Sequence, residues 1–417
     1  MTWSKAVAPR CPTKHAMSRA RDHTGSATWR DVPRGVIALG LVSLLMDISS
    51  ELIHALLPVF MITALGASTV TVGLIDGIAE ATAAITKVFS GALSDRIGKR
   101  KLLVGIGYGL AALTKPIFPL AGTTSAILAA RFLDRIGKGI REAPRDALIA
   151  DITPPAIRGA SYGLRQALDT VGAFTGPLLA VGLMALYADN FRAVFWWALL
   201  PAGLAVLLLL FGVREPDDVK ATPAQGRWPI RTAELKRMSS AYWKVVATGA
   251  MFALARFSEA FLILKAQADG LALTLLPLVY VWMNVVYATV AAPAGILSDK
   301  IGRQTMLLGA LAVLTLADLI LAFVPGLVGT ILGVGLWGLY LGLSQGLLSA
   351  LVADTAPDDL RGTAFGLFNL VTGVALLVAS TLAGWLWSAF GPTATFAAGA
   401  AFSGLSILIM AIGLART

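Results

Sequence analysis

The chain has 417 residues, of which 57% are hydrophobic and 14% are charged. Soluble domains carry roughly a quarter charged residues, so this composition excludes an ordinary soluble protein and predicts a protein of membrane-spanning segments. We interpret the formal net charge of +10 as lysine and arginine in cytoplasmic loops and not as a nucleic-acid-binding surface.

The first segment, residues 1–33, is basic and has no apolar core. It therefore lacks the apolar stretch of a secretory signal peptide, and we expect a disordered cytoplasmic tail. The tail contains Cys11, the single cysteine of the chain. A disulfide framework and a thiolate metal site are thereby excluded.

About twelve apolar runs of a length suited to membrane-spanning helices follow the tail. They fall at roughly 35–64, 70–93, 102–121, 125–149, 160–187, 192–213, 242–267, 272–297, 304–324, 328–353, 362–388 and 393–414. Basic residues gather in one set of connecting loops, which places those loops and both termini in the cytoplasm. We predict an all-α membrane protein with two six-helix bundles, 34–213 and 241–417, joined by a cytoplasmic linker over 214–240. We expect a monomer in the cytoplasmic (inner) membrane.

Two polar phrases occur once in each predicted bundle. GALSDRIGKR at 91–100 recurs as GILSDKIGR at 295–303, which begins 204 residues later. DITPPAIRG at 151–159 recurs as DTAPDDLRG at 354–362, which begins 203 residues later. Matching polar phrases among long apolar runs indicate a duplicated membrane bundle, in which the site usually lies between the halves.

The repeated phrases give the chain a resemblance to transporters of the major facilitator superfamily over nearly everything after the tail. The phrase at 91–100 is similar to that superfamily's signature loop between helices two and three, and the phrase at 295–303 is similar to the corresponding loop between helices eight and nine. Residues 131–139 resemble the helix-four motif, although Arg135 stands where a glycine is usual.

A third motif lies in predicted helix five. Gly172, Gly176 and Pro177 resemble the signature of exporters that run as antiporters, although the trailing glycine pair of that signature is missing here. The resemblance implies two bundles that alternate between inward-facing and outward-facing states, and this motif favours export.

The resemblance also implies that the repeated loops close the cytoplasmic side in one state. An aspartate there can face a helix N-terminus and nearby arginines, which is a favourable geometry. The alternative is a simple topology anchor. The expected conformational latch comprises Gly91, Asp95, Arg96, Gly98, Asp151, Arg158, Asp299, Arg303, Asp354 and Arg361. Within it we expect Asp151 to pair with Arg158, and Asp354 with Arg361.

Charged residues inside a membrane span are costly, so each is a candidate for function. In helix one, Asp47, Glu51 and His54 share a face, because offsets of four and seven keep them within about 60° of one another. Such a face can exchange protons, pair with helix-four cations or hold a divalent metal.

Helix four carries a stripe of charge at steps of four and three, which is one helical face. The stripe comprises Arg131, Arg135, Lys138, Glu142 and Arg145. Lipid cannot accommodate this charged stripe, so the stripe must face a cavity or other helices. We expect Arg131 and Arg135 to be functional and the residues from 141 to 146 to form a structural network. Asp47, Glu51 and Asp134 are the acids expected to offset the two arginines.

These interpretations define two sets of candidate residues. The proton-coupling set is Asp47, Glu51, Arg131 and Asp134. The substrate cavity is expected to contain His54, Asp76, Glu80, Arg131, Arg135, Arg165, Asp169, Arg256, Glu259, Asn284, Tyr287 and Gln345. Arg256 and Glu259, three residues apart, are expected to pair with each other, and Trp282 and Trp337 to serve packing.

The sequence has no GxxxxGK[ST] phosphate loop and no pattern of an enzyme or a resident cofactor or metal. The leading hypothesis is a secondary transporter that exports a small organic compound from the cytoplasm in exchange for protons. Alternatives are proton-coupled transport of an organic anion, suggested by helix four, and export of a divalent metal, suggested by helix one. A non-transporting membrane receptor is the least favoured.

Overall fold

The computed structural model describes residues 32–97, 99–154, 157–214, 235–357 and 360–414, and every regular element within them is a helix. Ten helical segments are long and apolar enough to cross a membrane, which confirms the all-α membrane class. Nearly all of the predicted disordered tail, most of the predicted linker and Gly98 lie outside the described residues.

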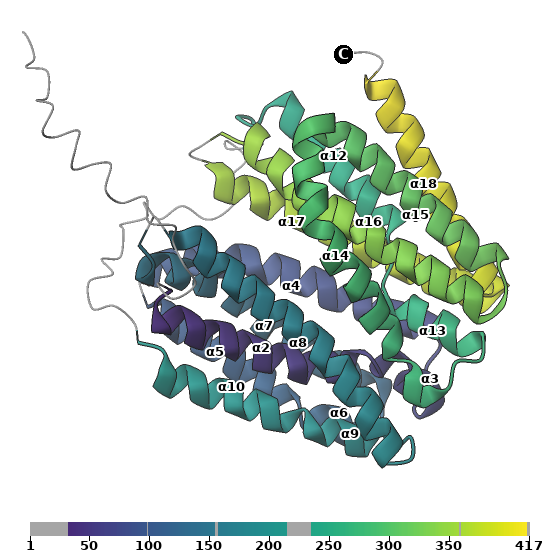
Figure 1. Cartoon of the computed structure of the whole chain (residues 1–417), viewed down its shortest axis with the longest axis horizontal. Helices are drawn as coiled ribbons and strands as arrows, with labels where there is room; N and C mark the ends of the chain where they lie inside the picture. The colour runs from purple at the N-terminus through teal and green to yellow at the C-terminus, as the bar shows by residue number, and fades with distance from the viewer. Residues whose placement is uncertain (1–31, 98, 155–156, 215–234, 358–359, 415–417) are drawn as a thin grey trace, which may run out of the picture.

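Each predicted apolar run coincides with one helix or with two consecutive helices. The amino-terminal half contains α2 (Arg34–His54), α3 (Leu57–Thr63), α4 (Thr69–Ile97), α5 (Arg100–Thr114), α6 (Ile117–Leu120), α7 (Thr124–Ile152), α8 (Arg158–Leu186), α9 (Phe191–Trp197) and α10 (Leu199–Gly212). The carboxy-terminal half contains α12 (Ser240–Ala255), α13 (Ala260–Ala268), η3 (Leu273–Leu275), α14 (Leu278–Ile301), α15 (Arg303–Phe323), α16 (Gly326–Thr355), α17 (Arg361–Phe390) and α18 (Pro392–Leu414). Figure 1 shows the halves as two bundles, one purple to teal and the other green to yellow.

Two helices of 29 residues each, α4 and α7, are not among the ten apolar segments. Both nevertheless pack along their length inside the amino-terminal bundle, against each other and with α7 against α5. They carry most of the charged residues that the sequence singled out, so the polar interior of this half is built on them.

The first helix of each half is interrupted at the matching place in the repeat. The interruption between α2 and α3 falls at residues 55–56, and that between α12 and α13 falls at 256–259. A shift of 204 residues superposes His54 on Ser258. Non-helical backbone at membrane depth is tolerated where it is buried in protein or lines a cavity. The paired interruptions therefore indicate where a site between the halves lies.

The halves meet chiefly along α4 and α17, which run antiparallel to each other. Glycines allow the two backbones to touch. A Cβ added to Gly77 would lie 2.9 Å from Leu377 Cα, and one added to Gly384 would lie 2.8 Å from Val70 Cα. This long, close contact is the axis on which one half is placed against the other.

We call the end of the bundle that adjoins the repeated phrases the basic end and the opposite end the far end. At the far end α3 packs against α13 (Figure 1), and α8 meets η3 and α14. Hydrogen bonds join the halves there, between Thr69 Oγ1 and Ser388 Oγ (2.7 Å) and from Thr274 Oγ1 to Asp189 Oδ1 (2.7 Å). The two halves are thus held together at the far end.

Candidate functional site

A cavity of about 220 Å³ lies between the halves at the level of the two helix interruptions. Its amino-terminal wall comes from α2, α4 and α7, and its carboxy-terminal wall includes residues of the 256–259 interruption. The charged lining is balanced: the acids are Glu51, Asp76, Glu80 and Glu259, and the bases are Arg131, Arg135, Lys138 and Arg256, with His54 beside them. The sequence placed all of these except Lys138 in the cavity or the proton-coupling set, and the structure brings them together.

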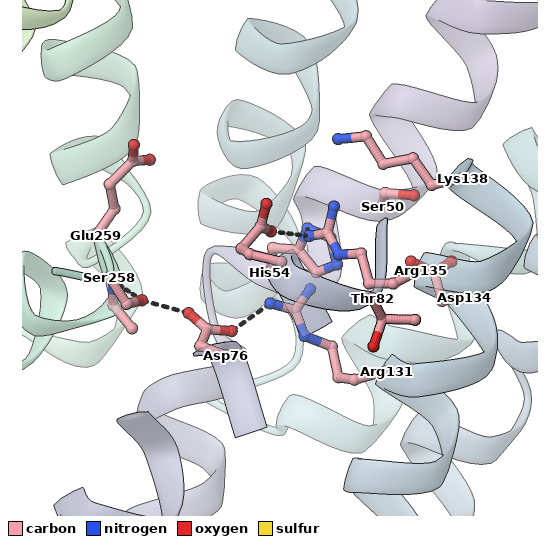
Figure 2. Close-up of polar contacts among 12 residues, drawn as sticks. Ser50, His54, Asp76, Thr82, Arg131, Asp134, Arg135, Lys138, Ser258 and Glu259 are labelled. Carbon is pink, nitrogen blue, oxygen red and sulfur yellow. Dashed lines mark hydrogen bonds and ion pairs between the residues drawn. The ribbon is translucent and has the colours of Figure 1, made fainter. Parts of the chain in front are cut away.

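Asp76 of α4 joins the two halves inside this cavity. One carboxylate oxygen accepts from Arg131 Nη2 and the other accepts from Ser258 Oγ, as Figure 2 shows. Ser258 Oγ also accepts from the backbone N–H of Ala260 (3.1 Å) at the start of α13. The oxygen of the Ser258 hydroxyl accepts that bond, so the hydrogen of the same hydroxyl is available to be donated to Asp76. Both Asp76 oxygens therefore act as acceptors.

Arg135 makes a second junction, between three helices of the amino-terminal half. Its Nη2 lies 3.2 Å from Glu80 Oε1 and 3.4 Å from His54 Nδ1. The same His54 nitrogen lies 3.5 Å from Glu51 Oε1. Glu51, His54, Arg135 and Glu80 therefore form one continuous polar chain across α2, α7 and α4. Figure 2 labels His54 and Arg135 of this chain.

The expected pair of Arg256 and Glu259 forms, with 3.3 Å between Nη2 and Oε1. The two residues lie in the interruption between α12 and α13, and not on one turn of a continuous helix as the spacing suggested. This places a charge pair on non-helical backbone in the cavity wall.

Asp134 acts on Arg135 only from a distance, because among the described residues it forms no ion pair with either arginine. It pairs with Lys115 (2.9 Å), which also donates to Ser50 Oγ (2.9 Å), and all of these groups are buried. The reason is helical geometry, since neighbouring residues on a helix lie about 100° apart. Asp134 precedes Arg135 by one residue and so faces away from the cavity, behind α7. Lys115 was not among the predicted residues, although a lysine inside an apolar run is itself a signal of function.

Three other predicted residues on α2 and α8 do not line the cavity. Asp47 faces α8, where a Cβ added to Gly172 would lie 2.9 Å from Asp47 Cβ. Arg165 and Asp169 pair with each other at 3.1 Å on α8 itself. Glu51 and His54 line the cavity whereas Asp47 does not, so the three side chains of the helix-one face are not gathered at one place in it. No group of three metal-ligating side chains occurs among the described residues.

Apart from Arg256 and Glu259, which were predicted, the carboxy-terminal half contributes different residues from those expected. Asn284 and Tyr287 of α14 line neither this cavity nor the second one, whereas Tyr280 of the same helix lines the first. The Gln345 side chain lies outside the described residues. Trp337 is buried and Trp282 Nε1 donates to the carbonyl oxygen of Ile331 (2.9 Å), so both serve packing as expected.

A second cavity, of about 240 Å³, continues from the first toward the basic end. The two share Glu80, Arg256 and Leu376 in their linings. The second is lined further by Tyr340, Ser344, Leu348, Phe368 and Thr372, so its carboxy-terminal wall is mainly apolar and hydroxyl-bearing. The space between the halves thus extends from the interrupted helices toward the basic end.

At the basic end both aspartates of the second repeated phrase form pairs that were not predicted. Asp151 pairs with Arg100 (3.0 Å), and Asp354 pairs with Arg303. The expected partners, Arg158 and Arg361, follow the next loop, whereas Arg100 and Arg303 begin helices that pack beside the aspartate-bearing ones.

The two pairs are equivalent in the repeat, because a shift of 203 residues superposes both members. Each pair ties α5 to α7 or α15 to α16 within one half. The side chains of Asp95, Arg96, Asp299 and Arg361 lie outside the described residues.

The helix-five motif is a packing surface. A Cβ added to Gly176 would lie 2.9 Å from both Glu51 Cβ and the Ile48 carbonyl oxygen. Together with Gly172 one turn earlier, this glycine lets α8 lie directly against α2. Pro177 follows inside α8. The motif therefore sets the position of the α2 acids.

Comparison with known proteins agrees with this architecture. The family model of the Major Facilitator Superfamily matches residues 39–375 and 261–417. An uncharacterized MFS-type transporter of Methanocaldococcus jannaschii is 33% identical over 387 residues, covering 91% of this chain and 95% of that protein. The quinolone resistance protein NorA of Staphylococcus aureus is 26% identical over 203 residues, about half of each chain. Among solved structures, the nucleoside transporter NupG has a TM-score of 0.76 at 13% identity, covering 90% of this chain and 99% of that one.

Proposed function

Because the chain belongs to the Major Facilitator Superfamily, we propose that it is a secondary transporter that exports a small organic compound in exchange for protons. The observation that carries this proposal is the charged cavity between the repeats, where Asp76 of one half accepts hydrogen bonds from Arg131 and from Ser258 of the other half. A change in the charge or occupancy of this cavity acts on both halves at once, as alternating access requires.

The membrane arrangement in this proposal has twelve spans. It adds α4 and α7 to the ten apolar segments, since both are long enough to cross a bilayer of about 30 Å. With the basic loops in the cytoplasm, the far end faces outward and both termini face inward. The space between the halves then extends toward the cytoplasm, which is the state in which an exported compound is loaded.

Export is favoured over import by two features. The glycine motif of α8 resembles the signature of antiporting exporters, and similarity to the resistance protein NorA extends over about half of the chain. Proton exchange is assigned to Glu51, whose carboxylate lines the cavity beside His54 at 3.5 Å, and to Asp47 one turn earlier on the α8-facing side. We assign the Arg100–Asp151 and Arg303–Asp354 pairs to the conformational latch with the repeated loops.

A second candidate, transport of an organic anion, is favoured by the guanidinium groups of α7. Arg131 Nε and Nη1 and Arg135 Nε are buried and have no hydrogen-bond partner among the described residues. Buried donors without acceptors are costly, and a carboxylate or phosphate matches a guanidinium fork. A substrate with an acidic group would satisfy these donors once the pairs with Asp76 and Glu80 rearrange.

A thermal-unfolding screen of the purified protein against cationic drugs, organic acids and divalent metals separates these functions. A ligand of the native state raises the unfolding temperature in a concentration-dependent manner. We expect organic compounds to stabilise the protein, with a smaller effect on Ser258→Ala and an unchanged effect on Thr315→Ala, a remote hydroxyl bonded to Ser403 (2.8 Å). Stabilisation by metals alone would select metal export instead.

A further inference from the structure

Asp318, a buried acid of the carboxy-terminal half, lies outside the charged cavity. Asp318 of α15 is 0% exposed, and its Oδ1 accepts from Trp337 Nε1 of α16 at 3.0 Å. Its Oδ2 has no hydrogen-bond partner among the described residues. No ion pair of Asp318 occurs in the part of the chain that the structure describes, unlike Asp76, Asp134 and Asp269.

The surroundings of Asp318 are mainly apolar. The hydroxyls of Thr315 and Ser403, which bond to each other at 2.8 Å, lie one turn away on α15 and α18. On the helix face of Asp318 lie Leu314, Ala317 and Leu321, each 0% exposed, and across from it the described neighbours are aromatic rings and Gly399 of α18. An ionised carboxylate in such a place would lack both water and a cation, so the group takes up a proton instead. Its one hydrogen bond, from an uncharged indole, can be made equally by the neutral acid.

Gly399 leaves the space that the carboxyl group occupies. A Cβ at this position would lie 2.5 Å from Asp318 Oδ2 and 2.9 Å from Phe257 Cε1. The unpartnered oxygen and the Phe257 ring are therefore neighbours. Phe257 lies in the interruption between α12 and α13 and also lines the charged cavity. Phe257 thus neighbours the free oxygen of Asp318 and also lines the charged cavity.

The aromatic packing connects Asp318 to residues that line the two cavities. The Trp337 ring lies 5.5 Å from Phe257 and 6.3 Å from Tyr340, which lines the second cavity. The titratable and charged groups that face this cluster are Tyr340 of α16 and, beyond Phe257, Arg256 and Glu259 of the interruption. A shift of the interrupted backbone would move the Phe257 ring and open a path from Asp318 to the cavity.

We propose that Asp318 is a second proton-binding site, in the carboxy-terminal half, which holds a proton in the observed state and exchanges it with the cavity when Phe257 moves. This inference rests on the proposed proton-coupled transport and adds to it a carrier that the charged cavity does not contain. The simpler role for the Asp318–Trp337 bond is a polar contact between α15 and α16, and the experiment below separates the two.

The test compares the wild type with Asp318→Asn, which keeps the shape and the acceptor for Trp337 but cannot exchange a proton. Infrared spectra recorded over a pH titration report protonated carboxylic acids directly. Spin labels on Ser125→Cys and Val328→Cys, both exposed at the far end, in a Cys11→Ser background, report the distance between the halves without any ligand. We expect Asp318→Asn to lose one protonated-acid band and to lose the pH-dependent change in the distance distribution.

Asp269→Asn is the matched control, because Asp269 of the same half is paired with Lys265 at 2.7 Å. It should keep both signals. The inference would be overturned if Asp318→Asn kept every protonated-acid band of the wild type. It would also be overturned if the variant lost a band but kept the pH-dependent distance change of the wild type. If the distance between the halves of the wild type does not change with pH, proton coupling itself is overturned. The infrared result distinguishes this outcome from a failure of the Asp318 assignment alone. Thermal unfolding verifies that both variants are folded.

Discussion

At the scale of single residues, the central group is Asp76. Its two oxygens accept from Arg131 and Ser258, so it neutralises a buried guanidinium and holds the carboxy-terminal half at the same time. The Arg131 and Asp76 side chains are only 5% and 14% exposed. Loss of one partner therefore leaves a largely buried charge without its counter-charge.

Asp76→Asn should destabilise the protein by about 3–5 kcal/mol, the range for removing one partner of a buried pair. The double variant Asp76→Asn with Arg131→Met should recover much of this stability, because it removes the unpaired charge, but it should not transport. Thermal unfolding of the wild type, both single variants and the double variant measures the coupling. Additive losses would mean that the two residues do not act as a pair.

The pair of Lys115 and Asp134 provides the contrasting case. It is more deeply buried, with side chains 1% and 3% exposed, but lines neither cavity. Asp134→Asn should destabilise the protein by a similar amount, about 3–5 kcal/mol. The double variant Lys115→Met with Asp134→Leu should recover both stability and transport. If the double variant is stable but does not transport, Asp134 has a functional role and belongs to the proton-coupling set as predicted.

At the scale of helices, the sequence predicted the charged face of α7 because its stripe has helical spacing and cannot face lipid. It could not predict which acid meets which base, since this depends on how α4, α5 and α7 are rotated against each other. Asp76 and Glu80 of α4 pair with Arg131 and Arg135, whereas the acid expected there faces α5. Likewise, the apolar runs revealed the first helix of each half but not its interruption.

The packing of α8 on α2 gives a test at this scale. Gly176→Ala would place a Cβ 2.9 Å from Glu51 Cβ and the Ile48 carbonyl oxygen, so α2 and its acids must shift. We expect reduced transport and a lower unfolding temperature. Gly182→Ala on the same helix meets nothing within 4 Å, so it should be neutral or stabilising by up to about 1 kcal/mol. Equal effects of both substitutions would remove the special role of Gly176.

At the scale of the whole molecule, the repeat and the hydrophobic runs were sufficient to predict two helical bundles with a site between them. The residues that join the bundles were not predictable in this way. Ser258 and Tyr280 are single polar residues without a distinctive pattern, and they reach the cavity only because the carboxy-terminal half is placed against α4. Contacts between halves depend on that placement, which the sequence spacing within one half does not encode.

The far-end contact predicts that locking the halves stops transport. Thr69→Cys with Ser388→Cys, whose hydroxyl oxygens are 2.7 Å apart across the halves, should form a disulfide that blocks transport until it is reduced. Thr315→Cys with Ser403→Cys, 2.8 Å apart within the carboxy-terminal half, is the matched control and should leave transport unchanged. If the cross-linked Thr69–Ser388 variant transports, the halves do not need to separate at this contact.

The most direct test of the account is proton-driven transport in proteoliposomes, with the compound that stabilises the purified protein most strongly in the thermal screen. With an acidic lumen, protons leaving the vesicle should drive the compound inward. We expect accumulation above the external concentration, which a proton ionophore abolishes and the oxidised Thr69→Cys/Ser388→Cys variant does not show. Uptake that is the same with and without the pH gradient, and the same in the cross-linked protein, would contradict proton-coupled alternating access.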